Sequence, residues 1–415
     1  MATHPCRCTA PTPPARPAVT GFSPLDQTLE LLSQTPLTPR LLEGLIRLGA
    51  ALPFEQVPEV LAFFTGVSVS VETVRRWTEA AGAVQLEREH AALDELVRTL
   101  PTPPAGPPLQ QLSADGAMVP LVGGEWAEVK TLVVGTVTPS ADGARAEALS
   151  YVSRLADAAT FSWQVTLETH RRGTLTAGTV VAVQDGADWL QGLVDLQRPD
   201  AVRILDFAHA VGHLGAVAQA VFGAGTAAAS EWLGQQVHTL RHDDPAVVLV
   251  GLADLAGAVR SGHQPAAQPT AAAVIEDCLG YLDSRRAQVR YAHFVAHGYP
   301  IGSGSVESAN KVLVEARLKG SGMRWSRANV NRVLVLRCLA RNGRWTEAWP
   351  GIWQGLRQRS QRPPRPRLPA AEPVADTPPP APPPHERPPR PKTIVNGKPT
   401  SDHPWRRSSP CRAKR

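Results

Sequence analysis

The sequence predicts an α/β protein in which a mixed sheet is preceded by a small helical module and interrupted by an all-helical segment. Three observations lead to this fold class. Apolar residues recur at helical spacing from about residue 22 to 82, and again from 210 to 295. Between these segments, short β-rich runs alternate with helical runs, an order that is typical of a layered sheet rather than a sandwich.

Residues 21–100 are predicted to form the helical module, after a segment at 1–20 that is expected to be disordered. A helix that ends at Gly66 is followed by one that Ser70 caps. We expect this next helix, VETVRRWTEAAG, to end at Gly82, since glycine is common just after a helix.

The two short helices around Gly66 suggest a helix-turn-helix, because the second carries Arg75, Arg76 and Trp77. We expect Arg75 and Arg76 to bind DNA. Any small helical bundle produces the same pattern, so plain packing is the alternative. The proline-rich segment PTPPAGPP at 101–108 is predicted to be a linker.

Five strand-like runs follow the linker. The first two, at 112–122 and 129–137, are joined by the hairpin sequence GGEW, and a third alternates at 148–154. Helical segments then separate two short apolar runs at 179–184 and 202–205. Runs of this kind are typical of buried central strands.

This order, a three-strand meander followed by helix-linked parallel strands, is the ribonuclease-H-like topology. It assigns residues 108–213 to the first part of a catalytic core and 214–295 to an all-helical insertion. Residues 296–350 would supply the closing helix of the core and a basic segment. In such a sheet the first and fourth strands lie side by side.

Three carboxylates stand where this fold would bring them together. Asp115 lies at the head of one apolar run and Asp185 ends another, so both are expected at the sheet edge where open sheets place their ligands. Glu307 falls in the first turn of the helix that opens in the stretch PIGSGSVESANK. Ser303 or Ser305 is the expected N-cap of that helix.

Clustered carboxylates repel one another unless a cation relieves them, and Mg²⁺ prefers oxygen ligands. We therefore expect two Mg²⁺ (or Mn²⁺) ions at Asp115, Asp185 and Glu307, the arrangement that catalyses phosphoryl transfer. Both Asp-Gly pairs are also typical of simple turns, which is the alternative. The strand context of both aspartates favours the metal site.

Asp206 and His209 follow the fifth strand and offer another possibility. Asp206 is an alternative metal ligand, but strand order favours Asp185, because the fourth strand is next to the first. We therefore expect Asp206 and His209 to orient neighbouring groups from behind the ligands.

A basic segment follows Glu307 and contains one tryptophan. We expect it to face DNA phosphates, with the tryptophan stacked on a base; a solvated helix and loop is the alternative. Its residues are Lys311, Arg317, Lys319, Arg324, Trp325 and Arg327.

The net charge of +6 is unevenly distributed. Residues 357–415 hold 14 Lys or Arg and 4 Asp or Glu, which leaves 29 basic and 33 acidic residues elsewhere. This segment also holds 17 of the 40 prolines, so we expect a disordered tail. Such a tail can bind nucleic acid by counterion release, or it can merely keep the protein soluble.

No apolar run is long enough to cross a membrane, and the first residues lack the apolar stretch of a signal peptide. The five scattered cysteines argue for reduced thiols. We therefore expect a cytoplasmic protein, associated with the bacterial nucleoid, with no membrane partner.

Four segments resemble bacterial insertion-sequence transposases of the Kra group, which are DDE enzymes related to the Mutator superfamily. The likeness covers roughly residues 38–345 and the tail motif KPTSDHPWRR. The segments are DGAMVPLVGGEWAEVK, VVAVQDGADWL, RILDFAHAVGHL and IGSGSVESANKVLVEARLKGSGMRWSRANVNRVLVLRCLARNGRW. By this resemblance Asp115, Asp185 and Glu307 match the catalytic triad, and Asp206 and His209 match an Asp-x-x-His signature.

The resemblance implies metal-dependent strand cleavage at transposon ends and strand transfer into target DNA. We expect double-stranded DNA as the partner and a homo-oligomer on it. Relatives often carry a cysteine-rich zinc-binding stretch before the helical module, of which only Cys6 and Cys8 remain here. A catalytically silent DNA-binding protein derived from a transposase is therefore one alternative, and a ribonuclease-H-like nuclease of structured DNA is another.

Overall fold

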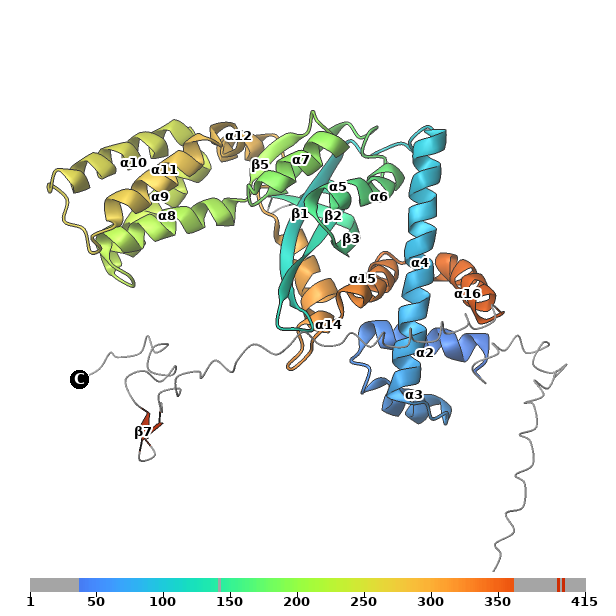
Figure 1. The fold of residues 1–415 in the computed structure, drawn as a ribbon. Coiled ribbons are helices and arrows are strands. Elements are labelled where there is room, and N and C mark those ends of the chain that lie inside the picture. Colours follow the sequence, from blue (N-terminus) through green and yellow to red (C-terminus); the bar gives the residue numbers. More distant parts are fainter. Residues whose placement is uncertain (1–36, 141–142, 362–393, 396–397, 400–415) are drawn as a thin grey trace, which may run out of the picture. The chain divides into compact units, whose positions relative to one another are not determined.

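A computed structural model describes residues 37–140, 143–361, 394–395 and 398–399 (Figure 1). The predicted disorder at 1–20, the Cys6/Cys8 pair and most of the predicted tail lie outside these residues. Within the tail, β6 (Ile394–Val395) and β7 (Lys398–Pro399) form a short antiparallel ladder of their own. Among the described residues, no helix is both long and apolar enough to span a bilayer.

A five-stranded mixed sheet confirms the predicted α/β class, and its order is β3-β2-β1-β4-β5. The first three strands pair antiparallel, whereas β4 and β5 run parallel to β1. The expected neighbourhood of the first and fourth strands is thereby confirmed. The strands are β1 (Leu109–Pro120), β2 (Trp126–Ser140), β3 (Gly143–Leu155), β4 (Thr179–Gln184) and β5 (Val202–Leu205).

The antiparallel strands are longer than predicted. In β3, the pairing with β2 shifts register between Val134 and Thr136, opposite Ala148, whose φ is 48°. Such a bulge interrupts the two-residue alternation, so the sequence pattern revealed only the part of β3 that follows it. Because β1 begins at Leu109 and not at residue 112, Asp115 lies inside this strand and not at its head.

Helices cover both faces of the sheet. On one face, Leu112 and Leu132 pack against Phe161 and Leu190. These partners belong to α5 (Ala158–Gln164) and α7 (Asp188–Gln197), and α6 (Thr166–Arg171) follows α5. On the other face, apolar residues of β1 and β2 pack against a helical segment at 304–318 and against α15 (Arg327–Arg341). The segment at 304–318 consists of α13 (Gly304–Ala309), the π-helical turn η2 (Asn310–Glu315) and α14 (Ala316–Leu318).

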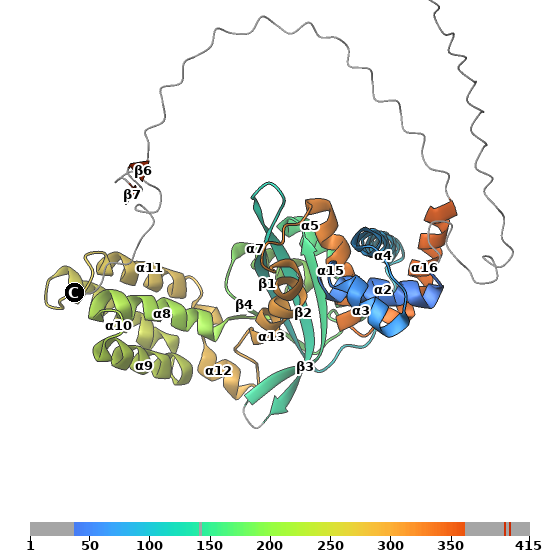
Figure 2. The same ribbon diagram turned by 90° about the horizontal axis from the view of Figure 1, so that it is seen from below.

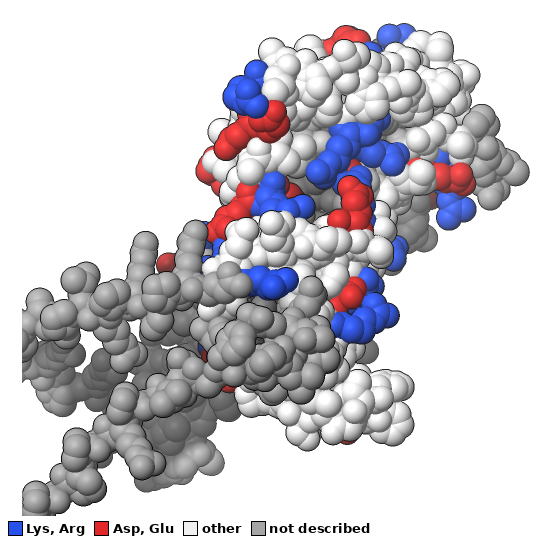
Figure 3. All heavy atoms as spheres, turned by 90° about the vertical axis from the view of Figure 1, so that its right-hand side faces the viewer, with Lys and Arg blue, Asp and Glu red and all other residues white. Residues whose placement is uncertain are grey.

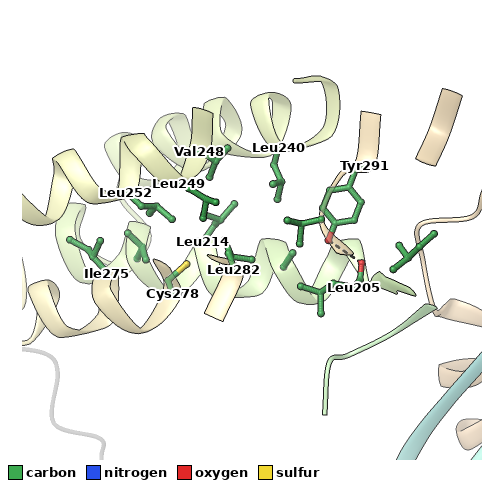
Figure 4. Packing of buried hydrophobic residues seen from close by; sticks show 14 of the residues in the cluster. Leu205, Leu214, Leu240, Val248, Leu249, Leu252, Ile275, Cys278, Leu282 and Tyr291 are labelled. Carbon is green, nitrogen blue, oxygen red and sulfur yellow. Dashed lines mark hydrogen bonds between the residues drawn. The ribbon is translucent and has the colours of Figure 1, made fainter. Parts of the chain in front are cut away.

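An all-helical segment stands between β5 and α13, as predicted. Its four long helices lie side by side in Figures 1 and 2 and enclose the apolar core drawn in Figure 4. They are α8 (Phe207–Phe222), α9 (Ala227–His242), α10 (Pro245–Arg260) and α11 (Ala271–Asp283), followed by η1 (Arg286–Gln288) and α12 (Tyr291–Ala296). The Tyr291 hydroxyl donates to the Leu205 carbonyl at 3.0 Å, which fastens this segment to the end of β5 (Figure 4).

Three helices form the N-terminal module: α2 (Pro39–Ala51), α3 (Val57–Thr65) and α4 (Val71–Thr99). Gly66 ends α3 with φ 70°, as predicted. The prediction that the third helix ends at Gly82 is wrong, since α4 continues to Thr99. A Cβ at Gly82 would lie 2.0 Å from the Arg332 carbonyl oxygen, so this glycine permits close contact between α4 and α15.

This module does not have a core of its own. Leu45 and Trp77 are buried in one cluster with Leu336, Ile352 and Leu356, which come from α15 and α16 (Trp345–Gln361). The predicted separate domain at 21–100 therefore shares its core with the last two described helices. Because α16 reaches Gln361, it also passes the predicted start of the tail at 357.

Candidate active site

Three aspartates lie within or directly after three neighbouring parallel strands, Asp115 within β1, Asp185 after β4 and Asp206 after β5. β1 pairs with β4 at a constant offset of 70 residues, and β4 pairs with β5 at an offset of 21. The last pairs are Leu112 with Ala182 and Gln184 with Leu205, so Asp185 and Asp206 directly follow the ends of β4 and β5, and Asp115 lies beyond the part of β1 that pairs with β4. The carboxyl ends of neighbouring parallel strands meet at one edge of a sheet, so the strand order brings these residues near one another.

The five carboxylate and histidine residues predicted to form the site line one open cleft, which has a volume of about 410 Å³. Asp115, Asp185 and Asp206 line it from the sheet, His209 from the first turn of α8, and Glu307 from the first turn of α13. The Glu307 side chain is exposed. The structure thus brings the three predicted metal ligands and the two predicted orienting residues together.

Asp115 is half-buried and held on both sides. Its Oδ1 accepts from the Gly116 backbone N–H at 2.7 Å and its Oδ2 accepts from Asn310 Nδ2 at 2.9 Å. Burial raises the pKa of Asp115, and the negative charges of Asp185 and Glu307 raise it further against the effect of those hydrogen bonds. A cation beside these three carboxylates would relieve this repulsion.

Asp185 lies in a tight turn, and side chains of the helical insertion form hydrogen bonds with the backbone of this turn. Its Oδ1 accepts from the Ala187 N–H at 3.0 Å, while Tyr281 Oη donates to its backbone carbonyl at 2.6 Å. Arg285 Nη2 donates to the Gly186 carbonyl at 3.0 Å. Gly186 has φ 84°, and a Cβ there would come within 2.6 Å of Tyr281 Oη. Residues on and just after α11 therefore fix the backbone at Asp185.

Both carboxylate oxygens of Asp206, unlike those of Asp185, accept hydrogen bonds from backbone N–H groups. Its side chain is buried; Oδ1 accepts from the His209 N–H at 2.8 Å and caps α8, and Oδ2 accepts from the Ser303 N–H at 2.6 Å. It thereby ties the end of β5 to the residues that precede Glu307. This is the behaviour expected of an orienting residue. Of the two predicted N-cap residues, Ser303 occupies that position, although its side chain makes no capping bond, and Ser305 lies inside α13.

His209 lies at the cleft beside a stack of aromatic rings. Its ring centroid is 5.1 Å from that of His213, which in turn stacks on Tyr281 at 4.0 Å. Burial lowers the pKa of His213, and His209 and Arg285 lower it further. The stack supports Tyr281, which holds the Asp185 turn.

Asn310 is a site residue that the sequence reasoning missed. It is 5% exposed, donates to Asp115, and has an Oδ1 without a hydrogen-bond partner among the described residues. Its position three residues after Glu307 in one helix was the available signal, because such residues share a helix face. The π-helical turn η2 begins at Asn310, and π turns are frequent at functional sites.

The donor atoms of the cleft suit Mg²⁺ or Mn²⁺. Asp115, Asp185 and Glu307 line the cleft and offer only oxygen ligands. Within the described residues, no three His, Cys, Asp or Glu side chains are close enough to surround an ion. Binding an ion between the carboxylates therefore requires their side chains to move closer together.

Two residues of the predicted basic segment lie inside the protein. Arg317 is 1% exposed, with its guanidinium 4.6 Å from the Phe54 ring centroid and 4.8 Å from that of Trp325. Trp325 is also buried and donates from Nε1 to the Leu318 carbonyl. Because both groups are occupied by these internal contacts, the expectation that they face a phosphate and a base is wrong in this structure.

The other predicted DNA-binding residues are on the surface, but none lines the carboxylate cleft. Arg75 pairs with Glu72 at 2.6 Å and with Glu79 at 3.4 Å. Figure 3 shows basic side chains interspersed with acidic ones on the face that it presents. The remaining residues are Arg76, which lies over the Trp77 ring, Lys319 and Arg327, which pair with Glu315 and Glu125, and the exposed Lys311 and Arg324.

No protein-family model matches this chain, and no curated protein matches it either.

Proposed function

We propose that this protein is a metal-dependent DNA transposase of the DDE type. One observation carries the proposal: Asp115 in β1 and Asp185 directly after the neighbouring strand β4 line one cleft with Glu307, which comes from a helix far along the chain. Two-metal phosphoryl transfer needs such a group of carboxylates, open to solvent and rich in oxygen. The resemblance of the surrounding segments to Kra-group transposases supports the choice of DNA as the substrate.

The sheet order supports a ribonuclease-H-like catalytic core. An antiparallel β3-β2-β1 meander continues into parallel β4 and β5, and the helical insertion enters between β5 and the helix that carries Glu307. In this proposal, α3, the turn at Gly66 and the start of α4 form a helix-turn-helix that reads the transposon ends. The protein would act in the bacterial cytoplasm as a homo-oligomer on double-stranded DNA.

Each part of the site has a role in this chemistry. Asp115, Asp185 and Glu307 would hold the ions, which when bound neutralise charge at the scissile phosphate and favour attack on it. Asp206 fixes the backbone at Ser303, and Asn310 orients the Asp115 carboxylate. These hydrogen bonds fix the backbone at Ser303 and the orientation of the Asp115 carboxylate before the substrate binds.

The test is strand cleavage of the DNA that flanks the gene. Purified protein is incubated with these fragments in Mg²⁺ or Mn²⁺, and nicks are mapped on both strands. We expect cuts at fixed positions beside inverted repeats. Asp115→Asn, Asp185→Asn and Glu307→Gln should each remove them by at least 100-fold while DNA binding and the melting temperature are retained.

Two outcomes would contradict the proposal. Specific binding of the flanking DNA without cleavage in either metal would favour the catalytically silent DNA-binding protein. Cleavage of branched junctions that lack the flanking sequences would favour the nuclease of structured DNA.

A further inference from the structure

A second groove adjoins the carboxylate cleft. It has a volume of about 670 Å³ and lies between β3, the insertion and α13. The segment at 302–308 separates the two spaces: Ser303 and Glu307 line the cleft, whereas Gly304 and Ser305 line the groove. The two spaces are therefore separated by one short segment of the chain.

Three arginines give this groove a single sign of charge. Arg145 comes from β3, Arg241 from α9 and Arg341 from α15, and all three are exposed. No aspartate or glutamate lines the groove, and among the described residues none of the three arginines forms an ion pair. This distinguishes them from Arg75, whose charge two glutamates neutralise.

Two of these arginines rest on aromatic rings. The Arg241 guanidinium is 5.8 Å from the Phe207 ring centroid, and that of Arg341 is 5.9 Å from the Tyr151 ring centroid. Such contacts orient a guanidinium without using its hydrogen-bond donors. The donors stay available for the oxygens of a phosphate, which arginine binds in bidentate fashion.

We propose that this groove binds the phosphodiester backbone of the DNA strand on one side of the scissile phosphate. The inference rests on the proposed function, because a phosphate at the carboxylates must be continued by further phosphates along the strand. Arg145, Arg241 and Arg341 each neutralise one of them. Such contacts position the duplex and carry no sequence information of their own.

The experiment measures equilibrium binding of full-length protein to a duplex with the flanking sequence, in EDTA, at several salt concentrations. The groove variant combines Arg145→Gln, Arg241→Gln and Arg341→Gln. The control variant combines Arg98→Gln, Arg260→Gln and Arg286→Gln, which removes the same charge from exposed arginines that pair with acidic neighbours.

We expect the groove variant to bind at least 10-fold more weakly at about 100 mM salt. The slope of log affinity against log salt should become shallower by about 0.9 for each lost phosphate contact. The control variant should stay within about threefold of wild type. Both variants should retain the wild-type melting temperature, because exposed substitutions rarely change stability.

Equal losses of DNA affinity in the groove and control variants would overturn this inference. The proposed function would still stand, because it is judged from cleavage by the wild-type protein. A wild-type protein that binds no DNA would overturn both. A groove variant that loses affinity for polyglutamate but keeps its affinity for DNA would assign the groove to an acidic polypeptide and also overturn it.

Discussion

Asp185 and Asp206 are the same residue type and directly follow two adjacent strands, yet their surroundings differ. Asp206 is 4% exposed and gives each oxygen to a backbone N–H. Asp185 is half-buried and receives one side-chain hydrogen bond, from the Ala187 N–H. The second oxygen of Asp185 is therefore the one available to a cation.

The first prediction separates these two roles. Asp206→Asn places an amide donor against one of two backbone N–H groups, so we expect a loss of about 1–3 kcal/mol of stability and a partial loss of cleavage. Asp185→Asn keeps its acceptor for Ala187 and should abolish cleavage with little change in stability. Differential scanning calorimetry and nicking rates on the same preparations check both. Equal losses of stability in the two variants would contradict the distinction.

The second prediction concerns the buried arginine. Arg317→Ala removes a side chain packed between two rings and a hydrogen bond to the Gly49 carbonyl, so we expect about 2–4 kcal/mol of destabilisation. Arg327→Ala, at an exposed arginine of the same segment, is the control and should change stability by less than about 0.5 kcal/mol. Urea unfolding measures both. An Arg317 variant as stable as the control would restore its predicted role at the surface.

The sequence could indicate the site carboxylates, but it could not indicate which residues of this basic segment are buried. Asp115, Asp185 and Glu307 were recognisable because strand order brings the first two together. Whether Arg317 faces solvent depends on Phe54, which is far away in the chain and reaches it only in the fold. No local pattern distinguishes an exposed basic face from one that packs on aromatic rings.

At the scale of elements, Gly66 and Gly82 show why one helix end was predicted correctly and the other was not. Both interrupt a helical pattern, but only Gly66 has the positive φ of a helix end. Gly82 stays inside α4 because α15 packs against it. The sequence near Gly82 contains no sign of α15, so its packing role could not be predicted.

The third prediction tests this packing glycine. Gly82→Ala should destabilise the protein, because its Cβ would lie 2.0 Å from the Arg332 carbonyl oxygen and force α4 away from α15. Gly44→Ala, in α2 with no atom within 4 Å of the new Cβ, is the control and should stabilise by about 0.5–1 kcal/mol. Thermal unfolding measures the change in melting temperature of both variants relative to the wild type. A stabilising Gly82→Ala would mean that α4 and α15 are not in close contact.

For the whole molecule, the sequence predicted the order of the parts better than their boundaries. The helical module, the sheet and the insertion follow in the predicted order. The module and the last two described helices nevertheless share one core, in which Trp77 and Leu356 are both buried. Contacts between segments so far apart leave no trace in local periodicity, so the sequence alone predicts a separate domain.

The fourth prediction concerns the C-terminal boundary. Removing residues 363–415 takes away 11 basic and 4 acidic residues, so the salt dependence of DNA binding should become shallower while the melting temperature is kept. Removing 357–415 also removes the last turn of α16, including the Arg359 pair with Glu87, and should lower the melting temperature. Fluorescence anisotropy and thermal unfolding check the two truncations. Loss of sequence preference in the shorter deletion would contradict the assignment of specificity to the helical module.

The central claim is that Asp115, Asp185 and Glu307 form one divalent-cation site. The most direct measurement is cleavage of the polypeptide by Fe²⁺ and ascorbate, since iron in a magnesium site cuts the backbone near its ligands. We predict cuts near all three residues that excess Mg²⁺ suppresses and that Asp185→Asn removes, with the cuts retained in Asp206→Asn. Cuts elsewhere, or a pattern that Asp206→Asn abolishes and Asp185→Asn leaves intact, would contradict the claim.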